Sequence, residues 1–472
     1  MNYEELYING EWVSPSSKEK IQVENPATKE YFGSVPAANE EDVNRAVAAA
    51  KEAFKTWQFT PLEERIRLLT ALVEELTLRI DDMAQVIVKE LGCGFKFARN
   101  IHVIPYIEDI KNYLTIIHDY DFEERFDEFI ILKEPVGVVG ALTPWNYPLG
   151  QIIKKLSPAL LTGNTMVLKP SQKTPLVAFM LAEAIDKVKF PKGVFNLVSG
   201  RGSEVGNVLA RHKDIDMITF TGSTKGGIEV YKIAAEDVKR VTLELGGKSA
   251  SIILKGADHR LALSKTLDKM YFNTGQSCSA YSRLLVPREE KEEIEKLIIE
   301  MTKDYKFGDP RDPDTIIGPV ASKQQFDKVS YYIRKGLEEG ARLILGEVPK
   351  ESKGYYIGPT VFTDVDNSME IARNEIFGPV LCIIPYDRVE EAIEIANDSV
   401  YGLSGAIFGP EEEALDVARR IRTGTIVINH GVQLHKGAFG GYKHSGLGRE
   451  GGKYGLEEFI EIKTMFINNP IT

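Results

Sequence analysis

The sequence predicts an α/β protein with two lobes, each built around a mostly parallel sheet. Its 472 residues exceed the usual length of a single domain. From residue 129 onward, short runs of apolar and β-branched residues alternate with stretches of helical periodicity. This alternation is typical of βαβ units, and it occurs both before and after Ser251. We therefore expect two α/β lobes.

Two helices are predicted ahead of the first sheet. The first covers residues 39–57, where Asn39 can cap the helix and the apolar residues fall on one face. The second covers residues 61–91, because Pro61 suits a helix start and Gly92 suits a helix end.

The elements of the two lobes follow from the same patterns. In the first lobe we expect strands within 129–142 and at 165–168, 194–198 and 217–220, with a helix at 176–188. In the second lobe we expect helices at 291–302 and 322–339 and strands at 380–385 and 424–429. No repeat or linker composition marks the border between the lobes.

Composition excludes several classes of protein. No run approaches the roughly 20 apolar residues of a membrane span, and Glu4 and Glu5 stand where a secretory signal would be basic. A net charge of −11 without a long basic block argues against nucleic acid as a partner. The three cysteines lie far apart, which excludes an obvious zinc site or disulfide framework. We expect a cytoplasmic protein with no membrane partner and no metal.

Cys278 lies among small polar residues, in the stretch 273–283. A structural cysteine usually lies in an apolar run, as Cys382 does. From this context alone, Cys278 is either a nucleophile or a small core residue.

Glu244 lies within the otherwise apolar run 241–245, which two glycines follow. A buried carboxylate is either paired, or its pKa is raised by desolvation so that it can serve as a base. Both interpretations remain open at this point.

Asn146 follows the strands of 129–142 and lies between Pro144 and Pro148, which hold the segment in a non-helical shape. Its amide can donate to an oxyanion, or it can simply satisfy the backbone of a turn.

The segment 220–227 connects a strand to a helix that we expect to begin near Gly226. Free backbone amides at such a helix start suit a phosphate, although the segment is not the G-x-G-x-x-G fingerprint. An ordinary strand-to-helix turn is the alternative.

In this order, Asn146, Lys169, the turn 220–222, Glu244 and Cys278 resemble the aldehyde dehydrogenase superfamily. The segments 375–379 and 439–450 extend the resemblance, which covers the chain from residue 7 nearly to its end. It implies a Rossmann-like cofactor-binding domain, an α/β catalytic domain and a small β oligomerisation element. The corresponding ranges are 1–119 and 134–246, then 247–444, and finally 120–133 and 445–472.

The resemblance also implies a mechanism with NAD or NADP as the cofactor. Cys278 would attack the aldehyde, the Asn146 amide would hold the oxyanion, and Glu244 would deprotonate the water that hydrolyses the thioester. Relatives that transfer the acyl group to coenzyme A generally lack a base at this place. A coenzyme A-acylating enzyme and a non-enzymatic binding protein remain the alternatives.

Further residues are assigned to the cofactor by the resemblance. The cofactor-binding set is Trp145, Lys169, Ser171, Gln172, Gly222, Ser223, Glu375 and Phe377. Gln172 replaces a common glutamate, which would repel the 2′-phosphate of NADP. We therefore expect NADP to be accepted beside NAD.

The resemblance also places residues at the aldehyde tunnel: Tyr147, Lys154, Phe272, Ser277, Ser279 and Phe439, with Gly150 and Gln433 nearby. Relatives similar to succinate-semialdehyde dehydrogenases carry a basic residue where Lys154 stands; otherwise this lysine extends to solvent. Tyr281 stands where the family usually has a small residue, and Ala438 replaces a common proline. A homodimer or homotetramer is implied.

Overall fold

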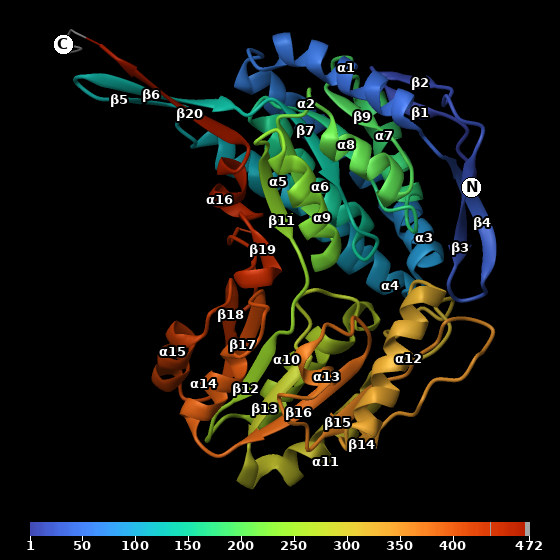
Figure 1. The fold of residues 1–472 in the computed structure, drawn as a ribbon, viewed down its shortest axis with the longest axis vertical. Coiled ribbons are helices and arrows are strands. Elements are labelled where there is room, and N and C mark those ends of the chain that lie inside the picture. Colours follow the sequence, from blue (N-terminus) through green and yellow to red (C-terminus); the bar gives the residue numbers. More distant parts are fainter. Residues whose placement is uncertain (435, 468–472) are drawn as a thin grey trace.

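The computed structural model describes residues 1–434 and 436–467. Two α/β bodies lie one above the other, and a narrow sheet projects from the first of them (Figure 1). The chain passes from the first body to the second between β11 (Arg240–Glu244) and β12 (Ala250–Ile253). This arrangement confirms the predicted α/β fold.

The first body contains an eight-stranded sheet of order β19-β11-β10-β7-β8-β9-β1-β2. Its five middle strands, from β11 to β9, are parallel, as the predicted βαβ pattern requires. The other strands have the bounds β1 (Leu6–Ile8), β2 (Glu11–Val13), β7 (Val138–Leu142), β8 (Thr165–Lys169), β9 (Phe195–Leu197), β10 (Met217–Thr221) and β19 (Gly446–Leu447).

Helices cover both faces of this sheet (Figure 1). They are α1 (Glu40–Trp57), α2 (Leu62–Leu78), α3 (Ile80–Leu91), α4 (Phe95–Phe97), α5 (Ile104–His118), α6 (Pro148–Leu161), α7 (Leu176–Val188), α8 (Asn207–Arg211) and α9 (Thr224–Ala235). π-Helical segments at Ala98–Val103 and Gly202–Gly206 lead into α5 and α8. The predicted cap of α1 is confirmed, because the side chain of Asn39 accepts a hydrogen bond from the N–H of Asp42.

The prediction of one helix over residues 61–91 was wrong, because the structure has two helices that meet at Arg79. The N–H of Arg79 donates to the carbonyl of Leu76, and its backbone leaves the helical conformation at φ −105°. Apolar residues on both sides of the break, such as Leu76 and Met83, are fully buried. The helical spacing of apolar residues continues through the break, and no Gly or Pro marks it, so the sequence pattern predicts one helix. Tertiary packing of the two apolar faces bends the chain there.

The second body contains a seven-stranded sheet of order β14-β15-β16-β13-β12-β17-β18. Its remaining strands are β13 (Arg283–Pro287), β14 (Arg342–Leu345), β15 (Thr360–Thr363), β16 (Val380–Tyr386), β17 (Ser404–Phe408) and β18 (Thr425–Ile428). Its helices are α10 (His259–Tyr271), α11 (Lys291–Met301), α12 (Lys323–Glu338), α13 (Glu370–Arg373), α14 (Val389–Asn397) and α15 (Glu411–Arg420). The four elements predicted here are all present.

A three-stranded antiparallel sheet, β20-β6-β5, forms the projection. It brings β20 (Ile460–Phe466) beside β6 (Phe129–Pro135) and β5 (Glu123–Arg125). The short helix α16 (Gly452–Glu457) precedes β20, and the strands β3 (Lys20–Asn25) and β4 (Glu30–Pro36) form a separate hairpin. We predicted that residues 445–472 belong to the oligomerisation element, but β19 within this range lies in the first sheet. Residues 468–472 lie outside the described residues.

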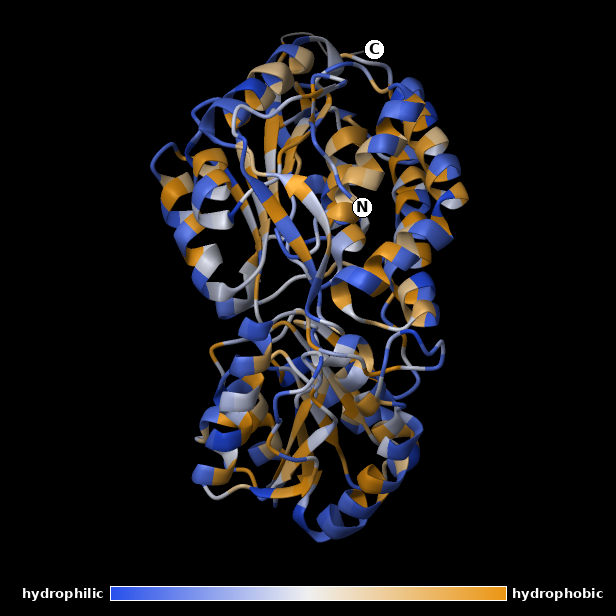
Figure 2. Cartoon of the chain, turned by 90° about the vertical axis from the view of Figure 1, so that its right-hand side faces the viewer, coloured by the Kyte–Doolittle hydropathy of each residue, from blue (hydrophilic) through white to orange (hydrophobic). Residues whose placement is uncertain are grey.

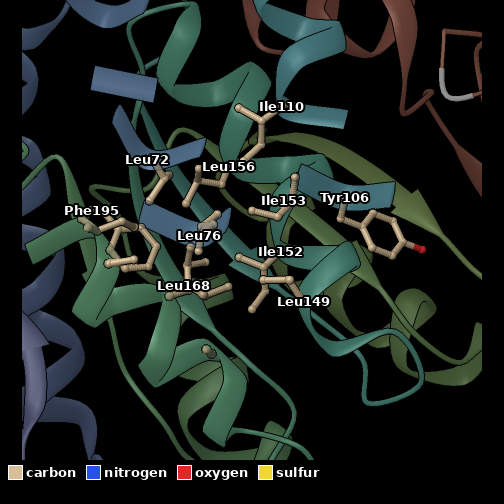
Figure 3. Packing of buried hydrophobic residues seen from close by; sticks show 14 of the residues in the cluster. Leu72, Leu76, Tyr106, Ile110, Leu149, Ile152, Ile153, Leu156, Leu168 and Phe195 are labelled. Carbon is tan, nitrogen blue, oxygen red and sulfur yellow. The ribbon is translucent and has the colours of Figure 1, made fainter. Parts of the chain in front are cut away.

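Apolar residues concentrate on the strands and on the helix faces that cover them (Figure 2). The largest core joins α2, α5 and α6 to β8 and β9, and Figure 3 shows Leu76, Ile153 and Leu168 within it. Tyr106 lies at the edge of this cluster, and its hydroxyl points away from the apolar side chains (Figure 3). Within the described residues, no helix is both long and apolar enough to cross a membrane.

Candidate active site

The predicted site segments meet where parallel strands of the first sheet end. Asn146 follows β7, Lys169 ends β8, Gly222 follows β10, and Glu244 ends β11. The carboxyl ends of parallel strands form the usual ligand-binding edge of such a sheet. The second body supplies Cys278 from the loop between α10 and β13.

The loop of Cys278 is held by side-chain amides. The Asn273 amide donates to the carbonyls of Asn146 at 2.8 Å and Gln276 at 3.2 Å. The side chain of Gln276 in turn donates to the Asn273 carbonyl at 3.0 Å and accepts from the N–H of Ala321 at 2.8 Å. These bonds hold Asn273 and Thr274 in left-handed backbone conformations, with φ of 55° and 56°, which are unfavourable for most side chains.

Asn146 is buried beside this loop, and its amide donates to the Gln276 carbonyl at 3.0 Å. That bond satisfies a backbone carbonyl, as the turn interpretation expects. It uses only one of the two hydrogens of the Asn146 side-chain amide. Among the described residues the second hydrogen has no acceptor, so Asn146 can also donate to a ligand beside Cys278.

Burial, together with the nearby carboxyls of Glu375 and Glu244, raises the pKa of the Cys278 thiol to about 12. The ammonium groups of Lys154 and Lys269 act in the opposite direction. The thiol is therefore neutral around pH 7 in this state, and it must lose its proton before it can act as a nucleophile.

Glu244 is only 4% exposed at the end of β11. Neither of its carboxyl oxygens has a hydrogen-bond partner among the described residues, which does not fit the interpretation of a paired carboxylate. Burial raises the pKa of Glu244 well above its usual value, and the charge of Glu450 adds to this effect, while Lys155 and Lys154 oppose it. Such a carboxyl suits a base that takes up and releases a proton.

A buried ion pair lies behind Glu244, and the sequence reading did not identify it. Lys155 of α6 donates to Glu450 at 2.5 Å and to the hydroxyl of Thr221 at 2.6 Å. Lys155 and Glu450 are almost fully buried. A signal was available, because the adjacent lysines 154 and 155 stand inside the otherwise apolar helix α6.

A cavity of about 460 Å³ leads to Cys278. All six predicted substrate residues line it: Tyr147, Lys154, Phe272, Ser277, Ser279 and Phe439. Lys154 does not extend to solvent, because its side chain is 15% exposed and its ammonium lies 4.7 Å from the centre of the Phe439 ring. The structure thus excludes the solvent-exposed interpretation of Lys154.

Tyr106 also lines the cavity, although sequence reasoning missed it. Its ring fits only because residue 150 is glycine, since a Cβ there would lie 2.2 Å from the ring. Behind Tyr147, the buried His102 ring stacks at 4.8 Å, and burial lowers the pKa of His102 to about 3. His102 is therefore neutral and supports the wall by packing.

Tyr281 lines the same cavity just beyond Cys278 and is 3% exposed. Its side chain packs into the core of the second body, together with Ala280 and Leu284. The bulky residue thus fills space behind the nucleophile and leaves the cavity open.

Several of the residues assigned to the cofactor contact one another, and Glu375 lies close enough to Cys278 to interact with it electrostatically. Rings of Trp145 and Phe377 meet edge to face at 5.4 Å, and Lys173 lies over Trp145. Glu375 accepts the N–H of Gly247 at 3.0 Å, and a Cβ on Gly246 would lie 2.7 Å from the same carboxyl group. Only glycine at position 246 leaves room for Glu375.

The segment 220–227 forms a capped helix start. The hydroxyl of Ser223 accepts the N–H of Gly226, so α9 begins at Thr224, two residues before the predicted start. The N–H of Gly222 donates to the carbonyl of Glu244 and ties β10 to β11. The Ser223 hydroxyl satisfies the N–H of Gly226. The amides before Gly226 at the start of α9 remain for an anion.

The polar groups of the residues assigned to the cofactor suit a dinucleotide. Lys169 is buried, its ammonium makes no hydrogen bond among the described residues, and burial lowers its pKa to about 8. Ser171 and Gln172 are half-buried beyond it. Together with the start of α9 and Glu375, they offer donors and acceptors for ribose hydroxyls and a pyrophosphate. No group of three or more His, Cys, Asp or Glu within the described residues could hold a metal ion.

The sequence profile of the aldehyde dehydrogenase family matches residues 12–465. The chain belongs to this family. The predictions of the family and of an NAD(P)-dependent aldehyde dehydrogenase are confirmed. The roles of individual site residues and the borders of the domains stay predictions.

Relatives of this aldehyde dehydrogenase match it over nearly its whole length. A protein of Staphylococcus saprophyticus, provisionally named an aldehyde dehydrogenase, is 46% identical over 98% of both chains. Aldehyde dehydrogenase of Mycobacterium tuberculosis, solved with NAD+, is 42% identical and superposes with a TM-score of 0.97 over 100% of this chain and 99% of that one. A mutant of aldehyde dehydrogenase C of Pseudomonas syringae, solved with NAD+ and octanal, is 43% identical, with a TM-score of 0.96 over 98% and 96% of the two chains.

Proposed function

We propose that the chain oxidises an aldehyde to the free carboxylic acid, with NAD or NADP as the hydride acceptor, through a thioester on Cys278. The observation that carries the proposal is the position of Cys278: it lines the cavity of about 460 Å³ and interacts electrostatically with Glu244 and Glu375.

In the first half-reaction, the Cys278 thiol gives up its proton to solvent water, and the sulfur attacks the aldehyde carbon. The free N–H of Asn146 and the backbone N–H of Cys278 hold the resulting oxyanion. The carbonyl then re-forms as the carbon loses a hydride, which leaves a thioester on Cys278. NAD or NADP, when bound, supplies the site that accepts this hydride.

In the second half-reaction, Glu244 takes a proton from water, and the hydroxide adds to the thioester carbon. The Cys278 thiolate leaves, and the acid is released. The raised pKa of Glu244 supports this role, because such a base can return its proton to solvent near neutral pH. Glu244 thus disfavours the coenzyme A-acylating alternative.

Lys169, Ser223 and Glu375 would hold the cofactor. The NAD+ complexes of the two solved relatives support NAD. Gln172 is neutral where a glutamate would repel a 2′-phosphate, and this supports NADP as a second cofactor.

For the substrate we favour an aldehyde that carries an acidic group, such as succinic semialdehyde. Lys154 and Lys269 both line the cavity, and their charges suit a carboxylate. A neutral aliphatic aldehyde is the alternative; the Pseudomonas syringae relative was solved with octanal.

The assembly we propose is a homodimer or homotetramer in the cytoplasm. Strand β20 exposes Ile462 and Phe466, at 60% and 83%, which supports burial against a second copy. Light scattering coupled to size exclusion would give the subunit number.

The experiment that tests the reaction is product analysis with the purified enzyme, NAD and an aldehyde panel, with and without coenzyme A. We expect NADH and free acid in equal amounts, with no dependence on coenzyme A. The Cys278→Ala variant should lose all turnover and retain cofactor binding. Retained turnover in that variant, or a product that requires coenzyme A, would overturn the proposal.

A further inference from the structure

One face of α10 carries charge into the substrate cavity. Lys265, Asp268, Lys269 and Phe272 all line the cavity, at the spacing that places residues on one side of a helix. Lys265 lies one turn further from the end of α10 than Lys269, about 5–6 Å along the helix axis. The nucleophile loop follows α10 directly, so Lys269 is the nearer of the two lysines to Cys278 along the chain.

Lys269 has no carboxylate within ion-pair distance in the part of the chain that the structure describes. Its ammonium donates a long hydrogen bond of 3.3 Å to the side-chain carbonyl of Gln433, which is neutral. Burial lowers the pKa of Lys269, and the positive charge of Lys154 adds to this effect; only the Cys278 thiol opposes it. An anionic group of a ligand could therefore pair with the ammonium of Lys269, because no carboxylate of the described residues pairs with it.

Lys154 differs from Lys269 in its electrostatic surroundings. Its ammonium lies 3.9 Å from Glu450 and over the ring of Phe439. Burial alone would lower the pKa of Lys154, but Glu450 and Asp109 raise it above the ordinary value. The protein thus offsets the charge of Lys154, which leaves this residue less suited to bind an external anion.

The cavity also contains two carboxylates, Asp268 and Asp109. Asp268 accepts a hydrogen bond from the hydroxyl of Tyr305 at 2.7 Å, and Asp109 contributes to the charge around Lys154. These negative charges favour a ligand with one charge, because a doubly charged phosphate would meet more repulsion than a carboxylate.

We propose that Lys269 is the specificity-determining residue that binds a carboxylate at the far end of the substrate, so that the enzyme acts on ω-oxo carboxylates. This inference rests on the proposed function, because the aldehyde end must reach Cys278. Phe272 and Tyr147 line the same cavity and would cover the methylene groups between the two ends.

The test compares four substrates with the full-length enzyme: succinic semialdehyde, the longer adipic semialdehyde, neutral butanal and glyceraldehyde 3-phosphate. The variants are Lys269→Met, which removes the charge and keeps most of the length, and Lys265→Met as the matched control one turn away. We expect Lys269→Met to lower kcat/KM for at least one semialdehyde about tenfold or more, mainly through KM, and to leave butanal within about twofold. Lys269→Arg should restore part of the loss.

Three outcomes would overturn the inference. One is a wild-type enzyme that prefers butanal to both semialdehydes, and another is a preference for the phosphorylated aldehyde. The third is an equal loss for butanal and the semialdehydes in Lys269→Met, which would indicate a structural role. In each case NADH formation from butanal or another neutral aldehyde would leave the proposed function intact, whereas no NADH from any aldehyde would contradict both.

Discussion

The side-chain amide of Asn273 donates to the backbone carbonyl of Asn146 at 2.8 Å, and this bond joins the two loops on which the chemistry depends. One loop carries Cys278, and the other carries Asn146, the proposed oxyanion donor. Asn273 also holds a left-handed backbone conformation at φ 55°, which asparagine tolerates better than most residues.

We therefore predict that Asn273→Gly lowers kcat by about 10- to 100-fold, because glycine keeps the backbone conformation but removes the amide that positions both loops. Cofactor affinity should change by less than about threefold, since the amide of Asn273 bonds to the carbonyls of Asn146 and Gln276 and to none of the residues assigned to the cofactor. Steady-state kinetics and a fluorescence titration with NADH measure the two effects. A normal kcat would show that the loops are positioned by other contacts.

Glu244→Gln tests the base. The amide cannot accept a proton from water, so we predict a burst of NADH equivalent to the active sites, followed by turnover at least about 100-fold slower than wild type. Stopped-flow absorbance at 340 nm separates the burst from the steady state. A linear trace at the wild-type rate would remove Glu244 from the mechanism.

The same groups set the pH dependence of the wild-type enzyme. Both Cys278 and Glu244 have raised pKa values, and both act in their deprotonated forms, so activity should rise as pH increases from about 6 to 9. The hydrolysis rate in single-turnover experiments should lose this rise in Glu244→Gln. A bell-shaped profile centred below pH 7 would contradict the assignment.

The sequence predicted the sheets and their helices because each element carries its own period of apolar residues. The break at Arg79 was not predictable, since the apolar period runs through it and no Gly or Pro marks it. The local context of Cys278, Glu244 and Asn146 left two interpretations open for each residue, and only the resemblance to the aldehyde dehydrogenase superfamily assigned their proposed roles. Lys155–Glu450 was missed because its two residues lie 295 positions apart, and Lys269 was missed because only packing shows which lysines of α10 face the cavity.

The buried pair of Lys155 and Glu450 gives a further prediction. Lys155→Met removes the hydrogen-bonded partner of Glu450 and leaves only Lys154, at 3.9 Å, so we expect a loss of up to about 3–5 kcal/mol in unfolding free energy. Because the charge of Lys155 lowers the pKa of Glu244, its loss should also raise that pKa and move the pH–rate profile to higher pH. Urea unfolding and the pH dependence of kcat measure these effects.

The double variant Lys155→Met/Glu450→Gln is the control, because it removes both charges. It should recover more than half of the stability lost in the single variant and return the profile toward lower pH. If the double variant were as unstable as the single one, the loss would come from packing and not from charge.

We propose that cofactor choice depends on the neutral side chain at position 172, which lies three residues after Lys169 and is half-buried. Gln172→Glu adds a negative charge where the adenosine ribose would bind. A glutamate can accept hydrogen bonds from the 2′-hydroxyl of NAD, but it repels the 2′-phosphate of NADP. We therefore predict that kcat/KM for NADP falls about tenfold or more, while the value for NAD stays the same or improves slightly.

Kinetics with both cofactors at a fixed aldehyde concentration give the ratio of the two kcat/KM values. The variant Gln172→Ala is the control, because it removes the amide without adding a charge. An equal fall for both cofactors would place residue 172 away from the 2′ position and would leave the NADP prediction without support.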